Sequence, residues 1–152
     1  MDMHKSSSHI QIQAEEMMFS KIEHRFGIKF EKNKKIYLAD NTYTYMQPDF
    51  YSEEFSIVGE IFAHIGKPKK AQDNKISNDI LKMLLLDKIS GKQYRKIIAV
   101  CDKKEMKKLM GQSVLAESIR QFGVEVILVE LDEDMRTKIL KAQEIQRMTN
   151  IL

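Results

Sequence analysis

The sequence is organised around the segment QPDFYSEEFSIVGEIFAHIGKPKKAQDNKISNDILK, which covers residues 47–82. Within it, Asp49 follows a proline, and Glu60 lies inside an otherwise apolar run from Phe55 to Ile65. A carboxylate in an apolar strand is costly to bury unless it is paired or binds a metal ion. Asp49 and Glu60 are therefore the first candidates for functional residues.

The composition is that of an ordinary soluble domain. The 152 residues are 43% hydrophobic and 31% charged, enough to bury one core. The net charge of +3 does not by itself indicate nucleic acid. Lysines cluster at residues 29–35, 67–70 and 103–108, although such runs are also typical of solvated loops and helix faces.

Cysteine content and hydropathy narrow the class of protein further. The one cysteine, Cys101, rules out a disulfide within the chain. No apolar run reaches the ~18 residues that a membrane span needs, and the first residues lack the apolar core of a signal peptide. We therefore expect a cytoplasmic protein that does not span a membrane.

Hydrophobic periodicity predicts a single α/β domain over residues 10–152, preceded by a disordered tail over residues 1–9. We expect a mixed β-sheet, with antiparallel hairpin strands plus parallel strands, flanked by helices. Helices are predicted over residues 10–26, 71–88, 103–122 and 133–148, and strands over residues 36–40, 42–50, 55–65, 96–101 and 124–131.

The two acids can be placed relative to each other from strand geometry. Alternation along the strand 55–65 puts Glu60, Phe62 and His64 on one side. Asp49 lies on the preceding strand, one tight turn away, so antiparallel pairing would bring the two carboxylates together. Such a pair can share a divalent cation such as Mg²⁺, which takes oxygen ligands and polarises a phosphoryl oxygen.

This arrangement resembles the PD-(D/E)XK nuclease superfamily, which has the restriction-endonuclease-like fold. The resemblance rests on Pro48–Asp49, on Glu60 eleven residues after Asp49, and on the order of elements over residues 10–131. It implies an αβββαβ core, here with an extra C-terminal αβα. It also implies Mg²⁺ or Mn²⁺ as cofactor, with Asp49, Glu60 and the carbonyl of Ile61 as metal ligands.

Two further positions follow from the resemblance. The superfamily lysine is absent, because Phe62 stands at its position, and some members carry this lysine on the following helix. Lys75 and Lys82 are the candidates, with Lys75 favoured because it is nearer the helix start. Glu15, in the middle of the apolar stripe of helix 10–26, would match an acid that some members carry there. The open alternative is that the Glu15 side chain extends to solvent or pairs with a lysine.

The resemblance implies a Mg²⁺-dependent phosphodiester hydrolase, a nuclease that acts on DNA. The loop and helix start after Glu60 supply the predicted nucleic-acid contacts, namely Lys67, Lys69, Lys70 and Gln72. A homodimer or larger complex would add specificity, through the helix 103–122 or the last helix. The alternative is a catalytically inactive nuclease-like module that binds nucleic acid or protein, which Phe62 favours; a purely structural role for the acids is the third possibility.

Overall fold

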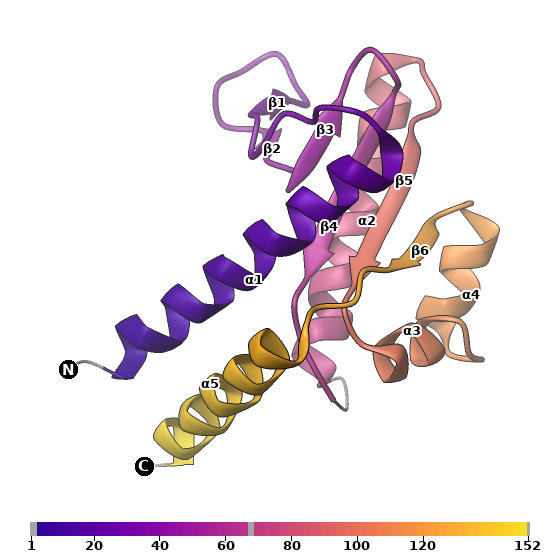
Figure 1. Cartoon of the computed structure of the whole chain (residues 1–152). Coiled ribbons are helices and arrows are strands. Elements are labelled where there is room, and N and C mark those ends of the chain that lie inside the picture. Colours follow the sequence, from indigo (N-terminus) through magenta and orange to yellow (C-terminus); the bar gives the residue numbers. More distant parts are fainter. Residues whose placement is uncertain (1–2, 67–68, 152) are drawn as a thin grey trace.

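The computed structural model describes residues 3–66 and 69–151, and in these the chain forms a mixed α/β fold (Figure 1). The helices are α1 (Met3–Phe26), α2 (Lys70–Ser90), α3 (Lys103–Leu109), α4 (Val114–Gln121) and α5 (Glu133–Ile151). The strands are β1 (Ile36–Tyr37), β2 (Tyr45–Met46), β3 (Phe50–Ser52), β4 (Ile57–Phe62), β5 (Arg95–Val100) and β6 (Glu125–Leu128). None of the described helices is long and apolar enough to cross a membrane.

The main sheet has the strand order β3-β4-β5-β6. The edge strand β3 is antiparallel to β4, whereas β4, β5 and β6 are parallel. Every residue of β4 is buried, because helices cover both faces of the sheet, and this explains why its sequence is almost continuously apolar. The mixed sheet with an antiparallel pair and parallel strands, as predicted, is confirmed.

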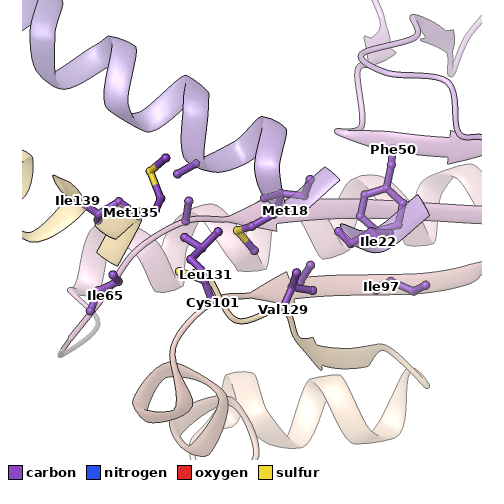
Figure 2. Packing of buried hydrophobic residues seen from close by; sticks show 14 of the residues in the cluster. Met18, Ile22, Phe50, Ile65, Ile97, Cys101, Val129, Leu131, Met135 and Ile139 are labelled. Carbon is purple, nitrogen blue, oxygen red and sulfur yellow. The ribbon is translucent and has the colours of Figure 1, made fainter. Parts of the chain in front are cut away.

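The core is divided between the two faces of the sheet. On one face, α1 and α5 pack against the sheet through a cluster that includes Met18, Ile22 and Ile139 (Figure 2). On the other face, α2, α3 and α4 cover the sheet, with Ile76 and Met83 of α2 fully buried. Because alternate residues of β4 face opposite layers, Glu60 faces α2 together with Val58 and Phe62.

Gly59 allows the close packing that brings β3 and β4 together. Phe50 of β3 is opposite Gly59 in the register, and its ring lies where a glycine side chain would be. A Cβ added to Gly59 would lie 1.9 Å from Cζ of Phe50, which is a severe overlap. Asp49 and Glu60 are the chain neighbours of this pair, so the packing also fixes the relative positions of the two acids.

Gly59→Ala is expected to destabilise the protein by roughly 1–3 kcal/mol, because the buried Phe50 ring has to move. Urea unfolding followed by circular dichroism measures this loss. Gly111→Ala is a matched control, since its added Cβ meets nothing closer than the carbonyl oxygen of Lys108 at 3.2 Å. An equal loss in both variants would contradict the close-packing explanation.

Two predicted strands differ from the structure. The strand predicted over residues 42–50 is divided, and β1 and β2 form a two-stranded hairpin outside the main sheet. Asn41 stabilises the turn, because its Oδ1 accepts hydrogen bonds from the N–H groups of Tyr43 and Thr44 at 2.8 and 2.7 Å. Pro48 lacks a backbone donor and separates β2 from β3. The prediction that three consecutive strands belong to one sheet is therefore wrong for β1 and β2.

Two helix predictions also need correction. The helix predicted over residues 103–122 is two helices, since α3 ends at Leu109 and Ser113 begins α4 by accepting a hydrogen bond from the N–H of Ala116 at 3.0 Å. At the N-terminus, α1 starts at Met3, so residues 3–9 are helical and not a disordered tail. Contacts between side chains four residues apart, such as His9 with Gln13 at 3.1 Å, support this first part of the helix.

Candidate active site

The two acids predicted from the sequence lie together at the edge of the sheet. The β3–β4 register, continued by one residue, places Asp49 directly opposite Glu60. Oδ2 of Asp49 accepts a hydrogen bond from the N–H of Ile61 at 2.6 Å. The carboxyl group of Glu60 is hydrogen-bonded to that of Asp49. The two side chains therefore point to the same place, and the peptide group of Ile61 adjoins them.

Glu60 is in an environment that disfavours its charge. Its side chain lies in the sheet with only 7% of its surface exposed. Burial, the neighbouring charge of Asp49 and the hydrogen bond to Asp49 raise the pKa of Glu60 to about 10, with a smaller contribution from Asp79, and Lys75 opposes them. Without a further cation, Glu60 is thus protonated at neutral pH.

Asp79 of α2 is a third carboxylate at this place. It is 5% exposed, and its Oδ2 has no hydrogen-bond partner among the described residues. Burial raises the pKa of Asp79, as does the charge of Asp49, while Lys75 and Lys82 lower it. Asp79 was not among the site residues predicted from the sequence, although an acid on the buried side of α2, four residues after Lys75, was a signal that could have identified it.

Glu15 approaches the same group from α1. Its side chain is half-buried and accepts a hydrogen bond from Nε2 of Gln11 at 3.2 Å. Burial raises the pKa of Glu15, and the charge of Asp49 adds to this effect, whereas Lys75 and Lys32 lower the pKa. Glu15 therefore lies within the electrostatic reach of both Asp49 and Lys75, as a residue of the predicted site would.

The two candidate lysines differ in what they contact. The ammonium group of Lys75 lies over the ring of Phe62, 5.1 Å from its centroid, and its charge acts on Glu60, Asp79 and Glu15. Lys82 instead contacts Asp79, with Nζ 3.8 Å from Oδ1. Among the described residues, Lys75 is the one lysine whose charge is a main influence on the pKa of Glu60.

The balance of charges and donor atoms fits a hard divalent cation. The charge of Asp49 acts on Glu60, Asp79 and Glu15, Glu60 and Asp79 are almost completely buried, and one oxygen of Asp79 has no described partner. Oxygen donors are those that Mg²⁺ and Mn²⁺ prefer. Among the described residues, no three or more His, Cys, Asp or Glu side chains are arranged to hold a metal ion. Two carboxylates and a backbone carbonyl, with water completing the shell, suit Mg²⁺, which usually keeps several waters.

The predicted nucleic-acid contacts lie at the start of α2. Lys69 and Lys70 are exposed there. Gln72 has a structural contact, because its Oε1 accepts a hydrogen bond from the N–H of Lys69 at 2.9 Å and so helps to cap the helix. Gln72 also lines a cavity of about 490 Å³ that extends between α1 and α5 and reaches Glu15. Lys67 lies outside the described residues.

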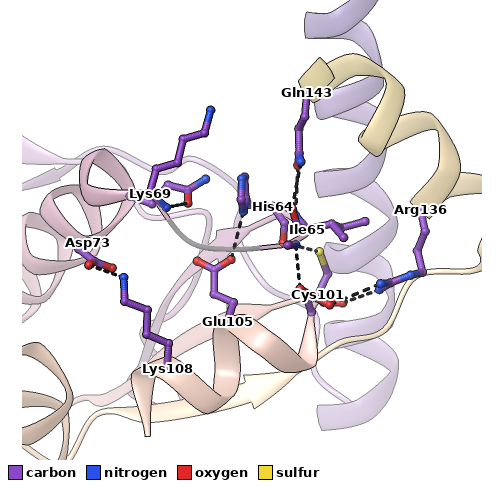
Figure 3. Close-up of polar contacts among 12 residues, drawn as sticks. His64, Ile65, Lys69, Asp73, Cys101, Glu105, Lys108, Arg136 and Gln143 are labelled. Atoms are coloured by element: carbon purple, nitrogen blue, oxygen red, sulfur yellow. Dashed lines mark hydrogen bonds and ion pairs between the residues drawn. The ribbon is translucent and has the colours of Figure 1, made fainter. Parts of the chain in front are cut away.

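His64, at the end of β4, lies beside Glu105 of α3 (Figure 3). Its Nδ1 lies 3.6 Å from Oε2 of Glu105, a carboxylate that is 1% exposed and has no hydrogen bond to either oxygen among the described residues. The sequence gave no sign of this contact, since an acid in the first turn of a helix is normally exposed. His64 is thus a strand-end residue with a buried partner.

Hydrogen bonds hold the segment after β4 in place. The N–H of Gly66 donates to Oδ2 of Asp102 at 2.8 Å. The amide of Gln143 bonds both backbone groups of Ile65, at 3.1 and 3.0 Å. Lys108 of α3 pairs with Asp73 of α2 at 2.6 Å (Figure 3). These contacts fix the start of α2, and with it the position of Lys75, relative to β4.

Comparison of this chain with protein-family models, with curated proteins and with solved structures finds no match. The function of the site is therefore inferred from its own side chains.

Proposed function

We propose that this protein is a Mg²⁺- or Mn²⁺-dependent nuclease that hydrolyses phosphodiester bonds of DNA, as a variant of the PD-(D/E)XK superfamily. One observation carries the proposal: the ammonium group of Lys75 lies over Phe62, the residue at the position of the superfamily lysine, beside the hydrogen-bonded Asp49 and Glu60. A helix lysine thereby brings the positive charge to the place where the strand lysine would bring it.

Each residue has a defined role in this proposal. Asp49, Glu60 and the carbonyl of Ile61 would hold the cation, with Glu15 beside them. When bound, the cation would supply Lewis-acid chemistry and lower the pKa of water near the phosphate. Lys75 would donate to the phosphoryl oxygens, where negative charge develops in the transition state. Asp79 of α2 contacts Lys82 and feels the charge of Lys75.

The alternative is a nuclease-like module that binds nucleic acid or protein without cleaving it. Phe62 favours this alternative, because it removes the strand lysine. The carboxyl groups around Asp49 argue against this alternative, because buried carboxylates without a cation destabilise a fold. Both functions predict nucleic-acid binding, so cleavage is the property that separates them.

The test is incubation of the protein with plasmid, linear duplex and single-stranded DNA in the presence of Mg²⁺ or Mn²⁺. Cleavage by the wild type, and no cleavage by Asp49→Ala or Glu60→Ala at equal protein concentration, supports the proposal. Circular dichroism shows whether the variants stay folded. DNA binding without cleavage by the wild type in either metal would favour the binding module.

Metal binding should depend strongly on pH, because the cation displaces the proton from Glu60. With the pKa of Glu60 raised to about 10, Mg²⁺ affinity is expected to rise roughly tenfold for each pH unit between pH 6 and 9. Isothermal titration calorimetry in buffers with different ionisation enthalpies measures the proton that is released. An affinity that does not change with pH would show that Glu60 is not a ligand.

A further inference from the structure

The hairpin of β1 and β2, residues 36–46, stands outside the main sheet next to β3 (Figure 1). It is fixed to the domain by Leu38 and Met46, which are 5% and 1% exposed and belong to the core on the α2 face. Asp49 follows Met46 by three positions, a distance of at most ~11 Å along the chain. A ligand on the hairpin would therefore lie close to the acid group.

The outer side of this hairpin carries three exposed tyrosines. Tyr37 is 52% exposed, Tyr43 86% and Tyr45 38%. Tyr37 and Tyr45 are opposite each other in the register, and their rings meet edge to face with centroids 6.0 Å apart. Since these rings are not buried in the core, their aromatic area contributes little to folding and is available to a ligand.

A lysine borders one of these rings, because Nζ of Lys35 lies 4.9 Å from the ring centroid of Tyr45. The neighbouring Lys34 lies over the buried Tyr51 and pairs with Glu31 at 3.1 Å. Residues 29–46 contain four lysines and two acids, Glu31 and Asp40, so their net charge is 4 − 2 = +2. Aromatic rings on which bases stack, next to cations that bind phosphates, are the two components of surfaces that bind single strands.

We propose that the hairpin binds an unpaired stretch of a nucleic-acid strand, with Tyr37, Tyr43 and Tyr45 stacking on bases and Lys35 contacting phosphates. The hairpin leads the strand to Asp49, and this last step rests on the proposed nuclease function. An unpaired strand fits better than a duplex, because the faces of paired bases are already stacked on one another and closed to the tyrosines.

The test is the affinity of the full chain for a fluorescent oligothymidine, measured by anisotropy in Ca²⁺ or EDTA so that the DNA stays intact. Tyr43→Ser and the double variant Tyr37→Ser/Tyr45→Ser are each expected to weaken binding about tenfold or more. Phe122→Ser is the matched control, because Phe122 is 51% exposed after α4, away from the hairpin, and its loss should leave the affinity unchanged.

Tyr43→Trp gives a second readout that does not depend on lost affinity. The chain contains no tryptophan, so the new indole is a single fluorophore at the hairpin. Binding of oligothymidine should quench its emission, and the affinity should be kept or improved, since tryptophan also stacks on bases. Unchanged emission at saturating DNA would overturn the stacking role.

Two further results would overturn the proposal: wild-type affinity in all tyrosine variants, or tighter binding of a duplex of equal length than of the single strand. The outcome is separable from that of the proposed function. Loss of affinity in the tyrosine variants of a protein that cleaves no DNA supports the hairpin and rejects the nuclease. Metal-dependent cleavage by a protein whose tyrosine variants keep their affinity supports the nuclease and rejects the hairpin.

Discussion

Glu60→Gln is expected to abolish metal-dependent cleavage and, in the absence of metal, to make the protein more stable. A glutamine has nearly the same shape as the protonated Glu60 side chain and keeps a hydrogen bond to Asp49, but it has no negative charge with which to hold a cation. Loss of several kcal/mol of transition-state stabilisation corresponds to a fall of about 10³-fold or more in the cleavage rate.

The gain in stability follows from the raised pKa. Between the ordinary pKa of a glutamate, 4.5, and the value of about 10 in the fold, the folded protein holds a proton on Glu60 that the unfolded chain releases. The metal-free wild type therefore loses stability as pH rises through this range. Glutamine removes this loss, which at pH 8 is worth about 5 kcal/mol, or roughly 10–20 °C in Tm.

Thermal unfolding at pH 5 and pH 8, with and without Mg²⁺, measures these effects. In the wild type, Mg²⁺ should stabilise the fold more at pH 8 than at pH 5, whereas Glu60→Gln should respond little at either pH. Glu53→Gln, an exposed glutamate of the same region, is the control and should behave as the wild type. A Glu60→Gln protein that is less stable at pH 8, or that still cleaves, would contradict the assignment.

The central sheet was largely predictable because its strands are buried on both faces. β4 lies in the apolar run 55–65 between Glu54 and Gly66, and β5 in the run 97–101 between Lys96 and Asp102. Such runs have few alternatives in an α/β chain. The limits of α2 were also predictable, since Gly91 ends it in the left-handed conformation that glycine tolerates, with φ 71°.

Other elements were not predictable because local signals compete with tertiary packing. Residues 36–39 and 43–46 are suited to strands, and the packing of Leu38 and Met46 helps to place β1 and β2 outside the sheet that contains β3. In the helix predicted over residues 103–122, Gly111 and Ser113 are compatible with continuation as well as with a break. Which of these occurs depends on contacts elsewhere in the fold.

Within the site, alternation along a strand was enough to place Glu60, and pairing across one turn was enough to place Asp49 beside it. The position of Glu105 required the structure, because the sequence does not show which side of a short helix such as α3 is buried. Lys75 was predicted from its place near the helix start, yet its contact with Phe62 could only be seen in three dimensions.

Lys75→Ala is expected to slow cleavage by about 10²–10³-fold, because it removes the cation that stabilises negative charge on the phosphate. Lys82→Ala should slow it less than tenfold, since Lys82 contacts Asp79 at 3.8 Å and is not among the main charges on Glu60. Single-turnover cleavage at saturating Mg²⁺ measures both rates, and DNA affinity in Ca²⁺ separates lost binding from lost chemistry.

Chemical rescue distinguishes a direct role of the Lys75 ammonium group from a structural one. Lys75 is exposed, so a small amine can enter the space that its side chain leaves. Added methylammonium should restore part of the activity of Lys75→Ala and should have no effect on Lys82→Ala or on the wild type. A purely structural loss, such as that of the contact with Phe62, is worth only ~0.5–1 kcal/mol at an exposed site and would not respond to the amine. A larger fall in rate for Lys82→Ala than for Lys75→Ala would instead assign the catalytic cation to Lys82.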